Sequence, residues 1–471
     1  MRRLTQLGVA LLVGMGSPLA LAAPAQATGD QLTVMSRNIY LGADVSVALE
    51  LIPDMPAAAQ FMWEQVAQTD FSKRAPVLAA ELARVKPDVV AVQEATTWYC
   101  RSSFFGSSTP VFDFTAQLLE ATKAAGVEYV MAEHDGERAF NPGYSIPVLP
   151  TLTTVRDPQT FQPIFGTDEA ACGFTIGDAL LVRADLADSV TAVGSGDYES
   201  KYAVVPVVFE IDRGYTWADL SLPHGTVRVV TTHLESVWDP GAPPVGAEQA
   251  RELVEVTKSW DMPLVVIGDF NSDPRDPRSE VDPNPGLQPD TTTGCDAQVG
   301  NPSSETADAT CNSYWTMVQA GFQDIGPDAL DPANATWGAS ALLAGPDPGR
   351  LASATSNPFG FTDRLDYIFV KNGVSVVTTD LIGEAWPQGE DMWACDSPDQ
   401  QRNAEEVASQ MQVELGVAFC LPTDHVGLVA LLDVPSTPTE APQDRTTFIV
   451  LGIVIVVGLT GVITFWALRR S

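Results

Sequence analysis

Val265-Val266-Ile267-Gly268-Asp269-Phe270-Asn271 is the stretch of sequence that decides the fold class. Its β-branched run is continuous rather than alternating, which predicts a strand that is covered on both faces. The run ends in an acid and an amide two residues apart, Asp269 and Asn271. Sheets covered on both faces belong to α/β proteins, so this segment predicts an α/β fold with polar side chains at a strand end.

Other apolar runs in the chain also end or begin with polar residues. These residues are Asn38, Glu94 and His233 at the ends of three runs, Asp366 near the start of another, and Asp424 and His425 just before the last. A single acid at a strand end is usually a turn residue, but so many together indicate a site. Carboxylate and amide oxygens are ligands of Mg²⁺, and histidine with asparagine can neutralise charge that develops on a phosphoryl group.

Strand-like runs and helical patterns are interspersed from residue 32 to residue 432. The predicted strands are 32–39, 88–94, 127–131, 178–182, 203–211, 227–233, 264–269, 365–370, 374–382 and 426–432, and the predicted helices are 57–85, 112–125, 247–260, 314–320 and 403–415. No linker divides these elements, so residues 29–434 are predicted to form one domain of two packed sheets with outer helices. Its main insertions are predicted at 96–177, 272–312 and 384–421.

Both ends of the chain carry the patterns of targeting segments. A basic start, an apolar stretch and the small-x-small sequence Ala25-Gln26-Ala27 predict a signal peptide over residues 1–27. Residues 447–468 lack charged side chains over about 33 Å of helix, which is enough to cross a bilayer. Residues 435–446 are rich in proline and threonine and predict a stalk. Arg469 and Arg470 then predict a cytoplasmic tail at 469–471, so the expected location is the cell membrane, single-pass, with the domain extracellular.

The charge is strongly acidic, with 26 Lys+Arg against 60 Asp+Glu and a net charge of −34. The two predicted targeting segments, with the short tail, hold four of the basic residues and no acid, so the remaining chain carries −38. This balance disfavours a basic groove along a polynucleotide backbone. It does not exclude phosphate ligands, because a bound divalent cation supplies local positive charge.

Six cysteines in an exported chain predict three disulfides. The cysteines are Cys100, Cys172, Cys295, Cys311, Cys395 and Cys420. Among the 15 pairings that six cysteines allow, the sequential one (100–172, 295–311 and 395–420) is favoured, because its last two bridges close short segments rich in Pro, Gly and Asp. A cysteine metal site is disfavoured, since the chain contains no C-x-x-C.

The ordered motifs resemble those of the endonuclease/exonuclease/phosphatase superfamily, which contains DNase I-like nucleases, neutral sphingomyelinases and inositol-polyphosphate phosphatases. Here the motifs are Ser36-Arg37-Asn38, Gln93-Glu94, Thr232-His233-Leu234, Gly268-Asp269-Phe270-Asn271, Arg364-Leu365-Asp366-Tyr367 and Thr423-Asp424-His425. The resemblance covers residues 32–434. It implies a DNase I-like four-layer α/β sandwich of two packed mixed β-sheets flanked by helices, here followed by one C-terminal transmembrane helix.

The resemblance implies a divalent metal, usually Mg²⁺, with Mn²⁺ or Ca²⁺ as alternatives. Glu94 would ligate the metal, Asn38 would bind the metal or the phosphate, and Asp424 would lie near the metal. Some family members carry a second acid two residues after the asparagine, where this chain has Tyr40. Asp44 would replace that acid, unless it is the N-cap of a helix that begins at residue 45.

The resemblance also implies the catalytic roles. Asp269 would orient or deprotonate the attacking water, and Asn271 would bind a phosphoryl oxygen. His425, held by Asp366, would contact the phosphate or assist proton transfer. His233 would be a second donor on the phosphate side. Together these residues imply hydrolysis of a phosphoester by in-line attack of water.

The motifs define phosphoester chemistry but leave the substrate open. The alternatives are a sphingomyelinase-like enzyme acting on a lipid headgroup, a nuclease acting on nucleotides or nucleic acid, and a non-catalytic binding module. The last is disfavoured because the acids, amides and histidines of the motifs are all present. Trp386, Met392 and Trp393 either enter a bilayer or pack beneath their insertion. His134 and His224 are predicted to be exposed turn residues, and no protein partner is inferred.

Overall fold

The computed structural model describes residues 29–158, 168–205, 209–236, 244–276, 302–338, 361–383, 392–394, 397–412, 414 and 419–436. The predicted signal peptide, nearly all of the predicted stalk and the predicted transmembrane segment lie outside the described residues. Within the described ranges, every helix is too short or too polar to cross a bilayer.

The larger of the two main sheets has nine strands and is mixed. Its central path is β18 (Ser375–Ile382), β21 (Gly427–Val434), β1 (Asp30–Asn38), β2 (Val89–Arg101), β9 (Glu169–Arg183) and β4 (Tyr129–Met131). Three further strands pair beside this path: β3 (Thr109–Asp113), β7 (Phe140–Ile146) and β8 (Thr154–Arg156). Strand β1 runs parallel to β2 and antiparallel to β21.

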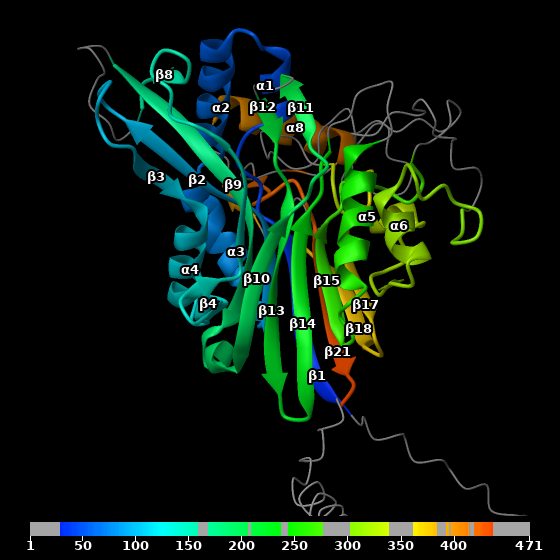
Figure 1. Ribbon diagram of the computed structural model, residues 1–471. Coiled ribbons are helices and arrows are strands. Elements are labelled where there is room, and N and C mark those ends of the chain that lie inside the picture. The colour runs from blue at the N-terminus through cyan, green and yellow to red at the C-terminus, as the bar shows by residue number, and fades with distance from the viewer. Residues whose placement is uncertain are drawn as a thin grey trace, which may run out of the picture.

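The second main sheet has six strands and is also mixed. Its order is β10 (Val190–Asp197), β13 (Gly214–Leu222), β14 (Gly225–His233), β15 (Leu264–Asp269), β17 (Asp366–Lys371) and β16 (Gln323–Asp324). Strands β14 and β15 are parallel, whereas the other neighbours are antiparallel. The two sheets pack face to face (Figure 1).

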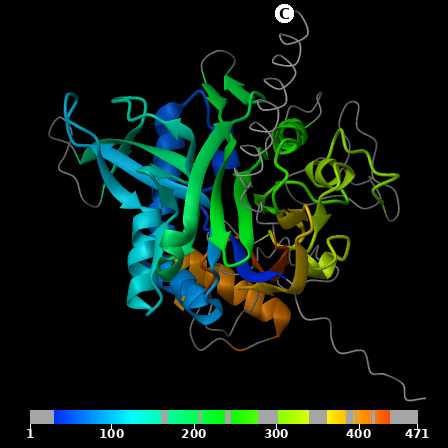
Figure 2. The same cartoon turned by 60° about the horizontal axis from the view of Figure 1, so that its bottom comes forward.

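Helices cover the outer faces of both sheets (Figures 1 and 2). On the larger sheet lie α1 (Val45–Glu50), α2 (Met55–Thr69), α3 (Phe71–Val85) and α4 (Phe114–Ala124), and on the smaller sheet lie α5 (Val245–Thr257) and α6 (Ser313–Gln319). α8 (Pro398–Met411) covers a small separate cluster that includes Trp393 and Leu421. The predicted arrangement of two mixed sheets flanked by helices is therefore confirmed for the described residues.

The surroundings of strand β15 explain why its sequence is continuously apolar. Val265 and Ile267 belong to the cluster between the two sheets, whereas Leu264 and Val266 belong to the cluster beneath α5 and α6. All four side chains are fully buried. Because successive side chains of a strand point to opposite faces, a strand with cover on both sides has no polar position until it ends.

Several predicted boundaries were wrong for identifiable reasons. The predicted helix 57–85 is interrupted at Asp70, whose φ of 34° is left-handed and whose side chain accepts from Ser72 N at the start of α3. The predicted strand 203–211 is a pair of antiparallel strands, β11 (Tyr202–Val205) and β12 (Phe209–Ile211). Strands β10 and β13 were missed because their polar and glycine residues hide the pattern. Residues 96–177 were predicted as an insertion, but they supply strands of the larger sheet.

The remaining short elements lie at the margins of the fold. They are β5 (Glu133–His134), β6 (Glu137–Arg138), β19 (Trp393–Ala394), β20 (Phe419–Cys420) and the 3₁₀ helices η2 (Ala184–Ser189) and η3 (Pro332–Asn334). Met392 and Trp393 are buried, and Trp393 Nε1 donates to Leu421 O at 3.1 Å. These two residues therefore pack beneath the insertion, whereas Trp386 lies outside the described residues.

The predicted disulfide between Cys100 and Cys172 is confirmed. The two cysteines face each other in register on β2 and β9. Cys311 and Cys420 each take part in a further disulfide. The predicted partners of these two, Cys295 and Cys395, lie outside the described residues.

Replacing Gly268 with alanine tests the close approach of β15 to β14. A Cβ atom at this position would lie 2.0 Å from the carbonyl oxygen of Thr232, its register partner. We expect Gly268→Ala to lower the free energy of unfolding by ~1–3 kcal/mol, because neither backbone can give way. Urea denaturation measures this. Ser221→Ala, at an exposed position of β13, is the control and should change stability by less than about 0.5 kcal/mol.

Candidate active site

Three of the predicted site residues lie side by side at one end of the smaller sheet. His233 is the register partner of Asp269, and Asp269 is the register partner of Asp366. Each lies an even number of positions from residues of its own strand that fill the space between the sheets, so its side chain is on the same face. The row therefore points toward the larger sheet, at the level where the apolar core ends.

Asn38 meets this row from the larger sheet. It is fully buried at the end of β1, and its Nδ2 donates to Glu94 Oε1 at 3.1 Å and to Asp269 Oδ2 at 3.0 Å. Its Oδ1 accepts from the backbone N–H of Tyr40 at 2.9 Å, which fixes the orientation of the amide. Asn38 thus presents a donor to the site. In this orientation both Nδ2 hydrogens face carboxylates of the site, and Oδ1, the atom that could ligate a metal, faces the Tyr40 backbone N–H.

A β-bulge brings Glu94 into the site. The register between β2 and β9 shifts between Val92 and Ala95, and Glu94 has a φ of 60°. The extra residue re-aims the side chain, so that Oε1 meets Asn38 and Oε2 accepts from Leu41 N–H. Positive φ values also occur at Tyr40 and at Asn271. Non-glycine residues in this conformation are held there by their surroundings, and such residues cluster at functional sites.

His425 and Asp366 form a buried pair. The His425 Nδ1 lies 2.8 Å from Asp366 Oδ2, and its Nε2 lies 3.5 Å from Asp269 Oδ2. Burial alone would lower the pKa of His425, but the carboxylates of Asp366, Asp269 and Asp424 outweigh it and raise the pKa to about 10. The imidazole is therefore a cation at neutral pH, with Nδ1 donating to Asp366.

His233 has the opposite character. Its Nδ1 lies 3.1 Å from Arg213 Nη1, and a guanidinium can only donate, so Nδ1 is the acceptor. Its Nε2 then carries the proton and faces Asp269 Oδ2 at 3.5 Å. Burial, the Arg213 charge and the His425 charge all lower the pKa of His233. Asp269 therefore lies between a neutral and a cationic imidazole.

Asn271 and Asp424 complete the predicted set. The Asn271 backbone N–H donates to Asp269 Oδ1 at 2.9 Å, and its Nδ2 donates to Leu234 O at 2.8 Å. Burial raises the pKa of Asp424 to about 6, with His425 opposing and Glu94 adding to the rise. Thr423 Oγ1 donates to Asn38 O at 2.9 Å, so the last motif is tied to the first.

Buried arginines that were not among the predicted site residues hold these segments together. Arg74 Nη1 donates to Ile39 O and to Pro422 O, and its Nη2 donates to Tyr40 O. Arg37 binds both carboxylate oxygens of Glu81, and its Nη1 donates to His425 O at 2.6 Å. Apart from the place of Arg37 beside Asn38 in the first motif, no signal in the sequence marks these residues.

Two further acids near the site were also missed. Asp273 accepts from Arg275 and from the backbone N–H of Arg364, which joins the loop after β15 to the start of β17. Asp178, in β9, is buried, and burial raises its pKa to about 8, with Arg213 opposing and Asp269 adding to the rise. Asp178 begins the predicted strand 178–182 and Asp273 falls in the predicted insertion 272–312, and neither was among the predicted site residues.

The other candidates lie elsewhere. Asp44 Oδ1 accepts from Val47 N–H at the start of α1, so its role as a helix N-cap is confirmed. His224 is in the exposed turn between β13 and β14, where it contacts Asp30. His134 is instead partly buried in β5, with its Nδ1 3.1 Å from Val190 O.

The donor set fits a hard divalent cation. Asp269, Asp366 and His425 offer ligand atoms within 4.8 Å of one another. The cationic ring of His425 has no free nitrogen lone pair for a metal, because Nδ1 donates to Asp366 Oδ2 and Nε2 is also protonated. The atoms available to a cation are therefore mainly carboxylate oxygens. Asp366 Oδ1 is buried and has no hydrogen-bond partner in the described part of the chain. Glu94 is partly exposed, and carboxylate oxygens are the ligands that Mg²⁺ and Ca²⁺ prefer.

Comparison with known proteins gives a family match. The model of the family described as Endonuclease/Exonuclease/phosphatase family matches residues 71–387. This range includes Glu94, His233 and Asp269, whereas Asn38 and His425 lie outside it. No curated protein matches the sequence.

Several solved structures are similar to the chain. An endonuclease/exonuclease/phosphatase from Beutenbergia cavernae DSM 12333 is 16% identical, covers 87% of this chain and 73% of its own, and has a TM-score of 0.42. A mannosyl-6-phosphatase from Bacteroides thetaiotaomicron VPI-5482 is 16% identical over 85% of this chain and 99% of its own, with a TM-score of 0.39. Humanized D. rerio TDP2 is 13% identical, covers 86% of this chain and 99% of its own, and has a TM-score of 0.40.

The buried pair of Arg37 and Glu81 gives a stability test. We expect Arg37→Met and Glu81→Leu each to lower the free energy of unfolding by about 3–5 kcal/mol, because each leaves the other charge buried and unpaired. The double variant should lose less than the two single variants together. Urea denaturation measures all three. Lys123→Met, which breaks an exposed ion pair with Glu128, should leave stability nearly unchanged. A fully additive double variant would contradict the argument.

Proposed function

The chain belongs to the endonuclease/exonuclease/phosphatase family, and on this premise we propose that it is a divalent-metal-dependent phosphoesterase. Hydrolysis would proceed by in-line attack of water on phosphorus. The observation that carries the proposal is the environment of Asp269. Its Oδ2 accepts a hydrogen bond from Asn38 Nδ2 and lies 3.5 Å from the Nε2 atoms of both His233 and His425. These donors favour the ionised form of the carboxylate, which is the form that can orient a water and accept its proton.

The titration of Asp269 suits a general base. Burial raises its pKa to about 7, His425 opposes this rise, and Asp366 adds to it. A base with a pKa near the working pH combines a useful fraction of the ionised form with the strength to take a proton. The cationic His425, oriented by Asp366, would stabilise negative charge on the phosphoryl oxygens. The Nε2–H of His233 would add a further donor, and Asn38 would hold the carboxylates of Glu94 and Asp269 in place.

A divalent cation would be held by carboxylates of this cluster, with Glu94 and Asp424 as the proposed ligands. Four acids (Glu94, Asp269, Asp366 and Asp424) face only one imidazolium, so the site carries an excess of negative charge, most of it buried. The cation would offset this charge and polarise a phosphoryl oxygen. Mg²⁺ is the proposed metal, with Mn²⁺ and Ca²⁺ as alternatives.

The arginines around the site argue against extended contact with a polynucleotide. Arg37, Arg74 and Arg213 are buried and donate to protein groups rather than to the space above the site. Proteins that bind polynucleotides place lysine and arginine where they can reach phosphates. With a net charge of −34, a small phosphoester or a lipid headgroup is the favoured substrate, and nucleic acid is the alternative.

We also propose that the protein acts outside the cell, anchored by residues 447–468. The disulfide between Cys100 and Cys172 supports an oxidising compartment. Strand β1 begins, and β21 ends, at the lower end of the molecule in Figure 1, where Asp30 pairs with Val434. Asn38 lies eight residues further along β1, about 27 Å away at ~3.4 Å per residue. The site would therefore open away from the anchor.

Removal of the metal tests the proposed reaction. The full-length chain with Mg²⁺ should hydrolyse bis(p-nitrophenyl) phosphate or p-nitrophenyl phosphate, and EDTA should abolish turnover because the carboxylates alone cannot neutralise the phosphoryl group. DNA and sphingomyelin assayed in parallel separate the candidate substrates. If none of the four is turned over in a metal-dependent manner, the chain is not this enzyme, and a binding module becomes the better description.

Substitution of the two central residues tests their roles. Asp269→Asn and His425→Ala should each lower kcat by ~10²-fold or more, since each removes a group that acts on the reacting atoms. Circular dichroism should show that the fold persists. The control is His224→Ala, at the exposed turn near Asp30, which should keep full activity. Near-normal rates in either site variant would refute the assigned role.

A further inference from the structure

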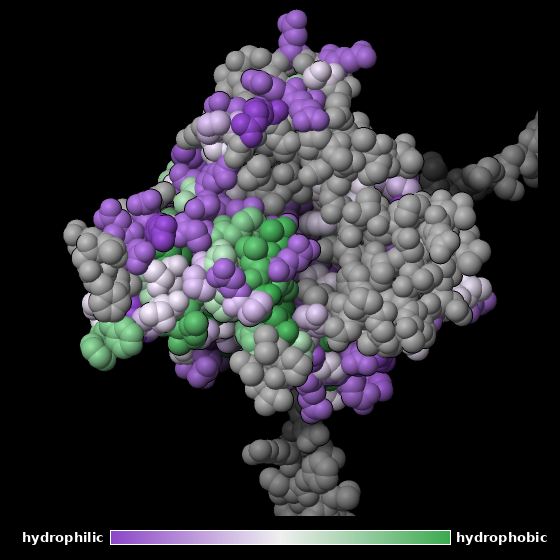
Figure 3. All heavy atoms as spheres, turned by 90° about the horizontal axis from the view of Figure 1, so that it is seen from above, coloured by the Kyte–Doolittle hydropathy of each residue, from purple (hydrophilic) through white to green (hydrophobic). Residues whose placement is uncertain are grey.

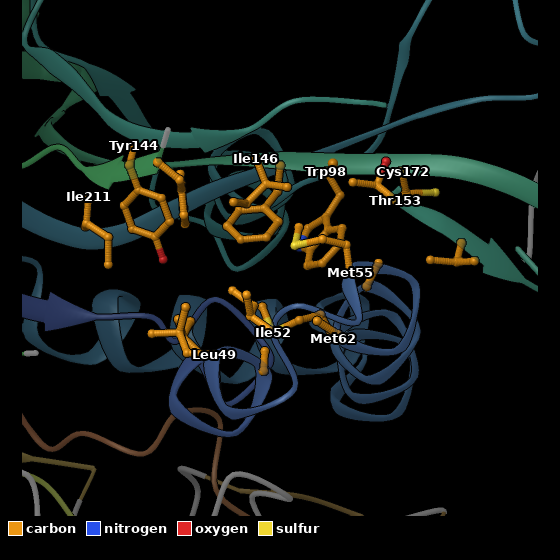
Figure 4. A pocket seen from close by; sticks show the side chains of 18 residues that line it. Leu49, Ile52, Met55, Met62, Trp98, Tyr144, Ile146, Thr153, Cys172 and Ile211 are labelled. Carbon is orange, nitrogen blue, oxygen red and sulfur yellow. The ribbon is translucent and has the colours of Figure 1, made fainter. Parts of the chain in front are cut away.

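An apolar pocket lies between the larger sheet and the helices α1 and α2. It is partly open to solvent, and nearly all of its lining side chains are apolar. Figure 4 shows Leu49, Ile52, Met55 and Met62 on the helical side and Tyr144, Ile146 and Trp98 on the sheet side. Most of its lining side chains also belong to the buried core of the larger sheet, and apolar pockets that open to the surface are typical binding sites for hydrophobic ligands.

The pocket is long and follows the strands. Its sheet wall includes Tyr144, which pairs with Ile176, and Val155, which pairs with Ala170. These positions are six residues apart along β9, which corresponds to about 20 Å. A compartment of this length with apolar walls suits an extended hydrocarbon chain. A base or a sugar would leave its polar groups without partners there.

One end of the pocket lies near the candidate active site, although none of the site residues lines the pocket. The ring of Tyr144 lies 5.6 Å from the guanidinium carbon of Arg213, and Arg213 donates to His233. On the helical wall, α1 begins four residues after Leu41, whose backbone N–H binds Glu94. A molecule in the pocket would therefore have one end near the groups that are proposed to bind phosphate and metal.

The surface around the pocket is also partly apolar. Figure 3 shows apolar side chains gathered near the middle of the upper face, bordered by polar ones. Val47 and Leu51 of α1, and Leu149 and Leu152 of the segment before β8, are between 36% and 46% exposed. Exposed apolar residues beside an apolar pocket are typical of sites that receive hydrophobic ligands.

We propose that this pocket binds the alkyl chain of an amphiphilic phosphoester whose phosphate lies in the candidate active site. The inference rests on the proposed function, because it assigns the substrate class of that same site. The apolar lining selects the chain, the length of the pocket selects an extended one, and the Tyr144–Arg213–His233 contacts join the pocket to the phosphate end.

Chain-length dependence of hydrolysis tests the substrate class. The full-length chain, held in an amphipathic polymer so that no detergent competes, is assayed with p-nitrophenyl alkyl phosphates bearing ethyl or decyl groups. We expect kcat/KM to be at least tenfold higher for the decyl ester, since a buried methylene contributes up to ~4-fold. Equal values for the two esters would overturn the proposal while leaving the proposed function intact.

Variants that fill the pocket test whether its lining residues cause the preference for the decyl ester. Ala58 is buried in the pocket wall on α2, so Ala58→Phe should bring the decyl-to-ethyl ratio close to one. Ala59→Leu, a smaller change in the same wall, should lower the ratio in part and serves if the first variant does not fold. Glu64→Phe, on the exposed side of α2, is the matched control and should keep the wild-type ratio. A ratio unchanged in both pocket variants would refute the assignment.

Direct binding separates this proposal from the proposed function. Isothermal titration calorimetry with decyl phosphate and ethyl phosphate, in EDTA, measures binding without turnover. We expect decyl phosphate to bind at least tenfold more tightly than ethyl phosphate, and the difference to be lost in Ala58→Phe and kept in Glu64→Phe. If no ester is hydrolysed but this binding holds, the enzymatic proposal fails and the pocket stands. Equal binding of the two phosphates would overturn the pocket proposal.

Discussion

The site depends on keeping four carboxylates, three of them buried and one partly exposed, close together where the two sheets meet. They are Glu94, Asp269, Asp366 and Asp424. Charges of one sign repel strongly where water is excluded, and burial is the largest cause of the raised pKa values of Asp269 and Asp424. The protein offsets this repulsion with the imidazolium of His425, the amide of Asn38 and backbone N–H groups. A divalent cation would add the charge that these groups do not supply.

The geometry around the acids is maintained by arginines that never reach solvent. Arg74 ties the segment after β1 to the segment before β21, and Arg37 ties the His425 backbone to α3 through Glu81. The stacked Phe71 and Phe114 lie against the Arg74 guanidinium, 4.8 and 5.5 Å from its central carbon. These arginines bind protein groups, so their positive charge is not available to bind a substrate. This is consistent with the acidic surface of the chain.

The apolar pocket shares its walls with the elements that build the site. Strand β2 carries Glu94 at its bulge and Trp98 in the pocket wall, and β9 carries Asp178 beside the site and Phe174 in the wall. The same strand extension therefore holds both the acids and the apolar surface. Residues 96–177, which the sequence marks only as additional length, contribute most of the sheet side of the pocket.

The sequence by itself determined the α/β class, the strands with continuous apolar runs and the polar residues at their ends, because burial on both faces of a strand leaves a direct pattern in the residues. It could not reveal β10 and β13, whose polar and glycine residues hide the strand pattern, or the roles of Arg37, Arg74 and Arg213, since the partners of these arginines include segments distant in the chain. Only the tertiary structure decided that His233, Asp269 and Asp366 share one register and meet Asn38. Register and sheet packing are long-range properties, which no local pattern records.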